Sequence, residues 1–196
     1  MIENYMAYIM MLDEKLGRFF EKQKPYIFCK PGCSKCCENA QYPFSQIEFE
    51  YIKIGFNLLP YNIKERVRLN VEKTLKLKRE NKEKKFAYVC PFLVNNMCSV
   101  YNYRGIICRT FGLMNVDVEG DGSNIPFCAY DGLNYSNVFD PEKQIISKDM
   151  YKKLGVEEEP CAFNVRYEFL TDPDFAKGFG FEFGPIKPLI NWFEEG

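Results

Sequence analysis

Nine cysteines and no histidine define the chemistry open to this chain of 196 residues. Four of the cysteines fall within the nine-residue stretch CKPGCSKCC. Cys29, Cys33 and Cys36 have C-x3-C-x2-C spacing, and Cys37 follows directly. Thiols clustered in this way are typical of zinc and iron–sulfur ligands.

The first cysteine group is predicted to lie on a tight loop that enters a helix near Ser34. Pro31 and Gly32 oppose a continuous helix through the whole group. Backbone N–H groups at the start of such a helix point toward the negative sulfur atoms. Neighbouring side chains on a helix diverge by about 100°. We therefore expect Cys36 and Cys37 to serve two sites, or one of them to ligate while the other packs.

The second cysteine group is spread over later loops. Cys90 precedes a proline, and Cys90 and Cys98 flank a predicted hairpin around Asn95-Asn96, because asparagine tolerates positive φ. Eight cysteines suffice for two four-thiolate sites, or for one cluster with four supporting thiols. The candidate metal ligands are Cys29, Cys33, Cys36, Cys37, Cys90, Cys98, Cys108 and Cys128.

The missing histidine narrows the site further. Zinc sites with histidine ligands are excluded within this chain. Nucleophile pairs of the Cys–His or Ser–His type are excluded for the same reason. Four-thiolate zinc or a thiolate-ligated [4Fe–4S] cluster remains, and either leaves a net charge of about −2. Lys35 and Arg109 are predicted to contact this cofactor and offset its charge, with Lys30 and Arg104 as further neighbouring cations.

Disulfide bonds are disfavoured, because the expected compartment is reducing and the number of cysteines is odd. Cys161, isolated in EPCAF, is expected to pack as a small buried hydrophobe.

Several helices are predicted to position the cysteine loops. Apolar residues recur at helical spacing over residues 1–24, and Pro25 ends that helix. Ser45 and Glu48 form a capping box in sequence, which predicts a helix to about Gly55. The other predicted helices are a charged one capped by Asn62 and running to about Lys84, a short helix or turn over 101–112, and one over 142–154 that ends at Gly155.

We predict a small α-rich α+β domain over residues 1–196, with helices and a β-hairpin organised around a cysteine-ligated metal site. The cysteines of both groups place the metal-binding region at 26–130. Residues 118–124 predict a Gly/Asp turn. Residues 171–196, rich in Pro, Gly and Phe, predict an ordered but irregular arm that wraps the body.

Charge is unevenly distributed along the chain. Residues 1–116 carry a net charge of +8 and residues 117–196 a net charge of −9. The two halves are expected to face each other, and the alternative is a basic face for an acidic partner. The helix over 62–85, with ten Lys/Arg and four Glu, is the surface for such a protein partner or acidic ligand. A solvated face with pairs such as Glu80–Lys84 is its simpler interpretation, and nucleic acid is disfavoured because the basic stretch lacks aromatic residues.

No stretch approaches the ~20 apolar residues of a membrane span. The amino terminus has Glu3 where a signal peptide carries positive charge. We therefore expect a cytoplasmic protein that does not contact the membrane.

CKPGCSKCC, followed about fifty residues later by CPFLVNNMCSVYNYRGIICRTFG, resembles the YkgJ-like cysteine-cluster family of zinc- or iron-chelating domains. The resemblance covers residues 26–130 and implies that the eight cysteines named above bind metal. This chain departs from the CxxCxxCC pattern in its first spacing, and Gly105 stands where the family usually has proline. Some members are labelled flagellin lysine N-methylases by similarity, so the resemblance also implies protein lysine methylation as an enzymatic role.

The C-x3-C-x2-C spacing is shared with radical S-adenosylmethionine enzymes, which place it early in a barrel of ~200 residues or more. Residues after Cys37 predict helices and a hairpin rather than repeated βα units, which disfavours that class.

Three functions follow from the cysteines: an iron–sulfur protein with a redox or enzymatic role, a zinc-stabilised binding module, and a protein of metal sequestration or delivery. The sequence singles out no catalytic residue. Tyr101, Tyr103 and Arg109 lie beside the second cysteine group, where packing is the expected role of the tyrosines.

Overall fold

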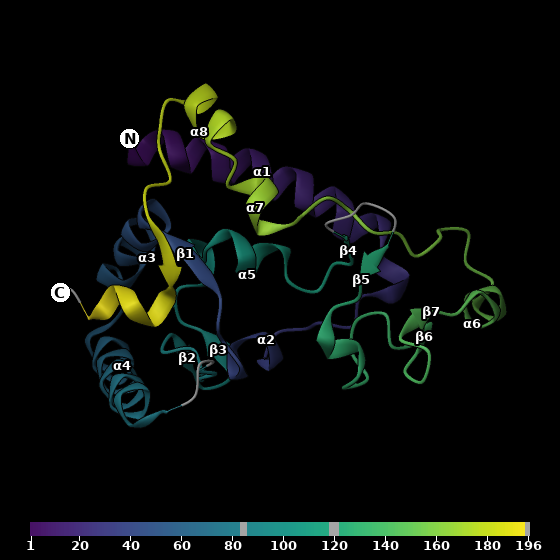
Figure 1. Cartoon of the computed structure of the whole chain (residues 1–196), viewed down its shortest axis with the longest axis horizontal. Coiled ribbons are helices and arrows are strands. Elements are labelled where there is room, and N and C mark those ends of the chain that lie inside the picture. Colours follow the sequence, from purple (N-terminus) through teal and green to yellow (C-terminus); the bar gives the residue numbers. More distant parts are fainter. Residues whose placement is uncertain (83–85, 118–121, 195–196) are drawn as a thin grey trace.

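The amino-terminal helix α1 (Ile2–Lys22) runs along the upper side of the fold and ends just before Pro25 (Figure 1). Its apolar residues recur every three or four positions, so that they share one face. This face packs on α3, α5 and α8 and confirms the predicted amphipathic helix. The buried residues of α1 are Tyr5, Tyr8, Ile9, Leu12 and Leu16.

The computed structural model describes residues 1–82, 86–117 and 122–194. Further α-helices are α2 (Lys35–Glu38), α3 (Gln46–Asn57), α4 (Tyr61–Glu80), α5 (Ile106–Thr110), α6 (Lys148–Leu154), α7 (Tyr167–Leu170) and α8 (Pro173–Phe179). Single 3₁₀ turns are η1 (Lys24–Tyr26), η2 (Tyr101–Tyr103), η3 (Phe127–Ala129) and η4 (Leu189–Phe193). The strands are β1 (Pro43–Ser45), β2 (Leu93–Val94), β3 (Met97–Cys98), β4 (Asn115–Val116), β5 (Ser123–Asn124), β6 (Phe139–Asp140), β7 (Ile145–Ile146) and β8 (Ile186–Pro188).

Short antiparallel ribbons connect the helices. Within the described residues, the strands pair as β1–β8, β2–β3, β4–β5 and β6–β7, each a two-stranded sheet. The α-rich α+β class is therefore confirmed, and the single hairpin that the sequence predicted is one of these small sheets.

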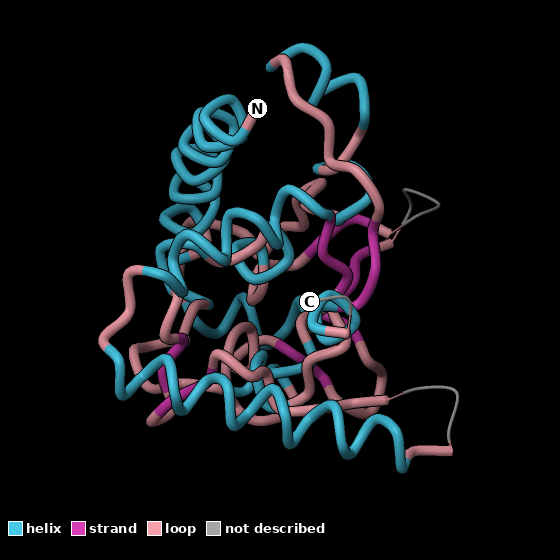
Figure 2. The backbone as a smooth tube through the Cα atoms, turned by 90° about the vertical axis from the view of Figure 1, so that its left-hand side faces the viewer, coloured by secondary structure: helices cyan, strands magenta, loops and turns pink. Residues whose placement is uncertain are grey.

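Two long helices lie on opposite sides of the molecule. Both views show α1 along the upper side and α4 along the lower side (Figures 1 and 2). The β2–β3 hairpin lies next to α4 in the lower half, with the short helix α2 to its right in this view (Figure 1). None of the helices in the described part of the chain is long and apolar enough to cross a membrane.

A buried carboxylate joins three helices at the centre of the fold. Glu48 of α3 is 0% exposed, and the predicted capping box with Ser45 is present. The Ser45 N–H and Oγ donate to Glu48 Oε2 at 2.8 and 2.7 Å, and the Ile106 N–H of α5 donates to Oε1 at 2.8 Å. The Tyr167 hydroxyl of α7 also donates to Oε2. Four donors compensate for burying this group.

The carboxyl-terminal segment is more regular than the predicted arm, because it folds into α8, β8 and η4. Strand β8 pairs with β1, with Phe44 opposite Lys187. The Trp192 indole N–H donates to the Phe44 carbonyl at 3.0 Å, and its ring stacks on Phe49. The segment is therefore ordered, as the sequence indicated, and it is more regular than the expected irregular arm, because strand pairing and aromatic packing shape it.

The charged helix begins and ends differently from its prediction. Its N-cap is Pro60, so Asn62 lies within the first turn rather than at the cap. The helix ends at Glu80, and the predicted Glu80–Lys84 pair and the end of the 62–85 surface fall partly on residues 83–85, outside those described. The hairpin prediction is confirmed, because Asn95 and Asn96 connect β2 to β3 with φ of 51° and 59°.

Residues 142–154 were predicted as one helix, and the first part of that prediction was wrong. Strands β6 and β7 form a hairpin there, and α6 begins only at Lys148. Ser147 caps α6, and Gly155 ends it in the left-handed region, as the sequence indicated. The predicted turn over 118–124 falls partly on 118–121, which lie outside the described residues.

Ion pairs join the basic and acidic halves of the chain. Lys78 Nζ lies 2.8 Å from Glu194 Oε2, and Lys35 Nζ lies 3.8 Å from Asp131 Oδ2. These pairs agree with halves that face each other. The acidic partner for the basic helix stays a prediction.

Candidate metal centre

The first cysteine loop is held in place by a side chain from far along the sequence. The N–H groups of Phe28 and Cys29 both donate to Asn134 Oδ1 at 2.8 Å. Gly32 adopts a φ of 88°, and the Cys33 N–H donates to the Lys30 carbonyl at 2.9 Å. This turn brings Cys29 and Cys33 together, because a left-handed residue reverses the chain locally.

Helix α2 begins after Ser34, as predicted, and carries Cys36 and Cys37. Their sulfur atoms are 3.8 Å apart. The Cys90 N–H donates to the Cys37 carbonyl at 2.7 Å, which joins the second cysteine segment to α2. Cys98 follows on β3, and Cys108 lies within α5.

One set of thiols surrounds the loop and η3. Burial raises the pKa of the Cys29 thiol to about 11, and the neighbouring Cys33 and Cys36 add to the shift. Burial also raises the pKa of Cys128 to about 11, to which Cys29 and Cys33 contribute. Cys29, Cys33 and Cys128 are therefore close enough to influence one another.

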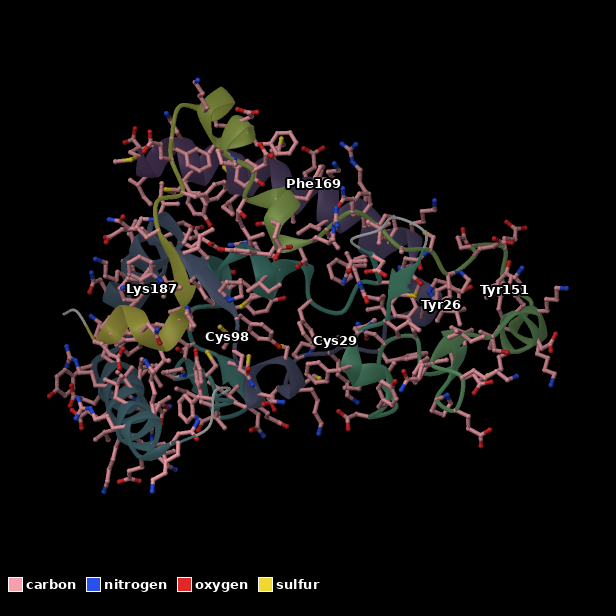
Figure 3. All side chains as sticks on the ribbon, in the orientation of Figure 1. Tyr26, Cys29, Cys98, Tyr151, Phe169 and Lys187 are labelled. Carbon is pink, nitrogen blue, oxygen red and sulfur yellow. The ribbon has the colours of Figure 1, made fainter. Side chains whose placement is uncertain are left out.

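A second set surrounds Cys37. The hydrogen bond with Cys36 lowers the pKa of Cys37, but the Cys90 thiol and burial outweigh it and raise that pKa to about 12. Burial raises the pKa of Cys108 well above its ordinary value, and Cys98, Cys37 and Cys36 add to the effect. Figure 3 shows Cys98 and Cys29, one from each set, on the two sides of α2.

Cys36 faces both sets. Its bond to Cys37 and its burial raise its pKa, and it also acts on Cys29 and Cys98. Adjacent side chains on α2 diverge, so this short helix presents thiols in two directions. That Cys36 and Cys37 serve two sites, or that one ligates while the other packs, stays a prediction.

A small cavity of about 20 Å³ lies against the second set. It is about large enough for one water molecule or ion. Four thiols and a mainly aromatic wall line it: Cys36, Cys37, Cys90 and Cys108, with Ala40, Tyr42, Phe44, Tyr88, Phe111 and Leu189.

One polar group in this wall lacks a partner. The Tyr42 hydroxyl is buried and forms no hydrogen bond among the described residues. Burial raises its pKa, and Cys36 and Cys108 raise it further, so the phenol lies near those thiols. A phenol O–H beside a thiolate or sulfide is a hydrogen-bond donor to sulfur, and such donors support metal ligands from the second shell of contacts.

The thiols gather without converging on one point. All nine cysteines are free, and in the residues from 1 to 82, 86 to 117 and 122 to 194 no three Cys, Asp or Glu side chains are arranged to hold a metal ion. Cysteine thiols suit a thiophilic metal. Because these thiols do not converge, binding one would require their side chains to rotate about χ1.

Of the four cations that lie near the cysteines in sequence, Lys35, Arg104 and Arg109 differ in the contacts that they make in the fold. Lys35 pairs with Glu38 at 3.6 Å and with Asp131. Arg109 is 4% exposed, pairs with Asp13, and donates to main-chain carbonyls. Arg104 is the cation whose charge opposes the raised thiol pKa values, those of Cys29, Cys36, Cys98 and Cys108.

Cys161 stands outside both sets. Gln23, which is 0% exposed, donates to its sulfur at 3.3 Å and accepts from its N–H at 3.0 Å. These bonds hold a loop against the end of α1.

Sequence reasoning missed Asn134 and Tyr42. An asparagine in a Gly-containing turn segment gives a local turn signal but no indication of the distant loop that it holds.

No family model, curated protein or solved structure matches this chain. The resemblance to the YkgJ-like family therefore stays a prediction.

Proposed function

We propose that this chain is a metal-binding protein whose thiolates hold an iron–sulfur cluster. One observation carries the proposal: eight of the nine cysteines, from distant segments, gather around α2 while the ninth is held elsewhere. Burial raises the pKa values of these thiols, so each stays a neutral thiol unless a bound cation stabilises its thiolate.

The mutual contacts support two four-thiol sets that meet at α2. Cys36 acts on Cys29, and Cys37 acts on Cys108. With each of the adjacent residues given to one set, the sets are Cys29, Cys33, Cys36 and Cys128, and Cys37, Cys90, Cys98 and Cys108. Each set has the four thiolates that a [4Fe–4S] cluster requires.

Two features favour iron–sulfur over other thiophilic metals. The wall beside the second set is largely aromatic, and burial of a cluster in apolar surroundings controls its redox potential. The unpartnered Tyr42 hydroxyl supplies a hydrogen bond of the kind that sulfide atoms accept. A bound cluster would supply electron-transfer chemistry, and the cysteines would fix its position.

Four-thiolate zinc is the second candidate, and the size of the cavity favours it. A volume of about 20 Å³ accepts one ion without expansion, whereas a four-iron cluster requires the wall to move. Zinc would cross-link the loop, the hairpin and α5, and so stabilise a fold whose sheets are short.

The deciding experiment measures iron, zinc and acid-labile sulfide per chain after anaerobic purification. Iron and sulfide of about four or eight each, with a broad absorption band near ~400 nm, support the cluster. One or two zinc ions without sulfide support the second candidate. A metal-free, normally folded chain contradicts both.

Single substitutions test the two sets separately. We expect Cys33→Ser and Cys37→Ser each to lower the metal content by about half, because each removes one ligand from a different set. Cys161→Ser is the matched control and should keep full metal content. Loss in Cys37→Ser alone would show one site, and full metal content in both variants would contradict the ligand assignment.

A further inference from the structure

A second cavity lies between α1 and the segment that contains η2 and α5. Its volume is about 380 Å³, within the range of small-molecule pockets. Helix α1 supplies one wall, and residues between 101 and 109 supply the other. The lining residues are Asp13, Leu16, Gly17, Phe20, Tyr101, Asn102, Arg104 and Arg109.

One of the two arginines is already occupied. Arg109 Nε donates to the Arg104 carbonyl at 2.9 Å, and Nη2 donates to the Asn102 carbonyl at 2.8 Å. Its Nη1 pairs with Asp13 of α1. Arg109 therefore joins the two walls of the cavity. Because Asp13 neutralises its charge, it is not free to bind an anionic ligand.

The other arginine keeps donors available. The Arg104 guanidinium lies 3.9 Å from the centre of the Tyr101 ring, and its buried Nε has no hydrogen-bond partner in the described chain. Stacking on an aromatic ring fixes the guanidinium plane and leaves its edge free for an anion. A buried, unpaired donor is costly unless a ligand satisfies it.

We infer that this cavity binds a small organic carboxylate, with its carboxylate on the guanidinium of Arg104 and its apolar part against Leu16 and Phe20. The planar guanidinium matches a carboxylate in a bidentate geometry. A phosphate is disfavoured, because its further charge would need a second free cation and Arg109 is paired. The apolar lining from α1 favours a ligand with a hydrocarbon or aromatic portion.

The pocket goes beyond the metal proposal and does not depend on it. The probe is 3-phenylpropionate, titrated calorimetrically into the full chain as purified. We expect saturable binding with a Kd below about 1 mM, and no binding of 3-phenylpropionamide, which lacks the charge. Absence of saturable binding, equal binding of the amide, or tighter binding of inorganic phosphate would overturn the inference.

Two variants separate recognition from folding. Arg104→Gln should weaken binding about ten-fold or more, whereas Arg66→Gln, on exposed α4, should leave it unchanged. Gly17→Leu fills the cavity from α1, where a Cβ would meet nothing within 4 Å. It should abolish binding without lowering the melting temperature, since leucine favours a helix more than glycine. Gly178→Leu, which is equally open on α8, is its control.

The outcomes also distinguish the two proposals. Probe binding that survives in Gly17→Leu, or in Arg104→Gln at unchanged affinity, overturns the pocket whatever the metal content. A metal-free chain that still binds the probe overturns the metal proposal and supports the pocket.

Discussion

A single methyl group at Gly105 should destabilise the fold and disturb the wall of the thiol cavity. A Cβ atom there would lie 2.3 Å from Cε1 and 2.8 Å from Cδ1 of Phe44, and 2.9 Å from Oε1 of Glu48. Favourable carbon–carbon contacts lie at about 3.5–4.0 Å. Phe44 is 2% exposed and Glu48 is 0% exposed, so neither side chain can turn into solvent.

The size of the effect follows from these contacts. Overpacking of a dense interior costs about 1–3 kcal/mol, and 1 kcal/mol shifts the melting temperature of a chain of this length by about 2–4 °C. We expect Gly105→Ala to melt about 2–12 °C lower, measured by circular dichroism. Metal content should also fall, because Phe44 lines the thiol cavity.

Gly17→Ala is the matched control. A Cβ at position 17 of α1 meets nothing within 4 Å, and alanine favours a helix by up to about 1 kcal/mol over glycine. The same chemical change should therefore raise the melting temperature there.

Gly105→Pro is the strictest test of the steric argument at this position. The φ of −69° at Gly105 suits proline, and proline is common at this position in the resembling family. Because proline also carries a Cβ, we expect it to destabilise this chain as alanine does. A Gly105→Pro chain more stable than the unaltered one, or a Gly105→Ala chain that melts within about 1 °C of it, would show that Phe44 yields readily and would refute the reasoning.

Further perturbations test other parts of the fold. Burial raises the pKa of Glu48, so the stability it contributes is full below the unfolded pKa of about 4.3 and is lost as pH rises through the folded value. The difference in urea midpoint between the unaltered chain and Glu48→Gln should therefore shift in favour of Gln as pH rises above about 4.3, and a constant difference would contradict this. Trp192→Phe should cost about 1 kcal/mol in urea unfolding, because the bond to the Phe44 carbonyl is lost, and no change would show that the segment is held otherwise. Chelation should lower the melting temperature of the purified protein by several degrees if its thiolates hold metal, and Tyr42→Phe should shift the redox potential of a bound cluster without removing it.

Local signals in the sequence predicted the local elements well. The apolar spacing of α1, the Ser45–Glu48 capping box and the Asn95-Asn96 turn each act within a few residues, so their residue types alone indicate the structure. The hairpin of β6 and β7 was missed, because strands of two residues carry no periodic pattern. The pairing of β1 with β8 was missed for another reason, since it joins segments far apart in the chain.

In the candidate site, too, the sequence indicated the local features and missed those that depend on distant contacts. Residue type and spacing selected the eight cysteines, but they could not show which thiols share a set. Arg104 and Arg109 both lie within four positions of Cys108 in the sequence. Only folding turns one toward the thiols and pairs the other with Asp13 on α1.

Arg104 links the two proposed sites through a single positive charge. Two thiolate sites of about −2 each would place strong negative charge in the interior, and Arg109 cannot offset it because Asp13 already neutralises that guanidinium. A carboxylate bound in the cavity would draw on the same guanidinium that the thiolates face. The two sites should therefore oppose each other, and by thermodynamic reciprocity each bound anion weakens the other by the same factor. Added negative charge at a bound metal, such as an electron, would favour release of the carboxylate, so Arg104 would couple ligand occupancy to the charge state of the proposed centre.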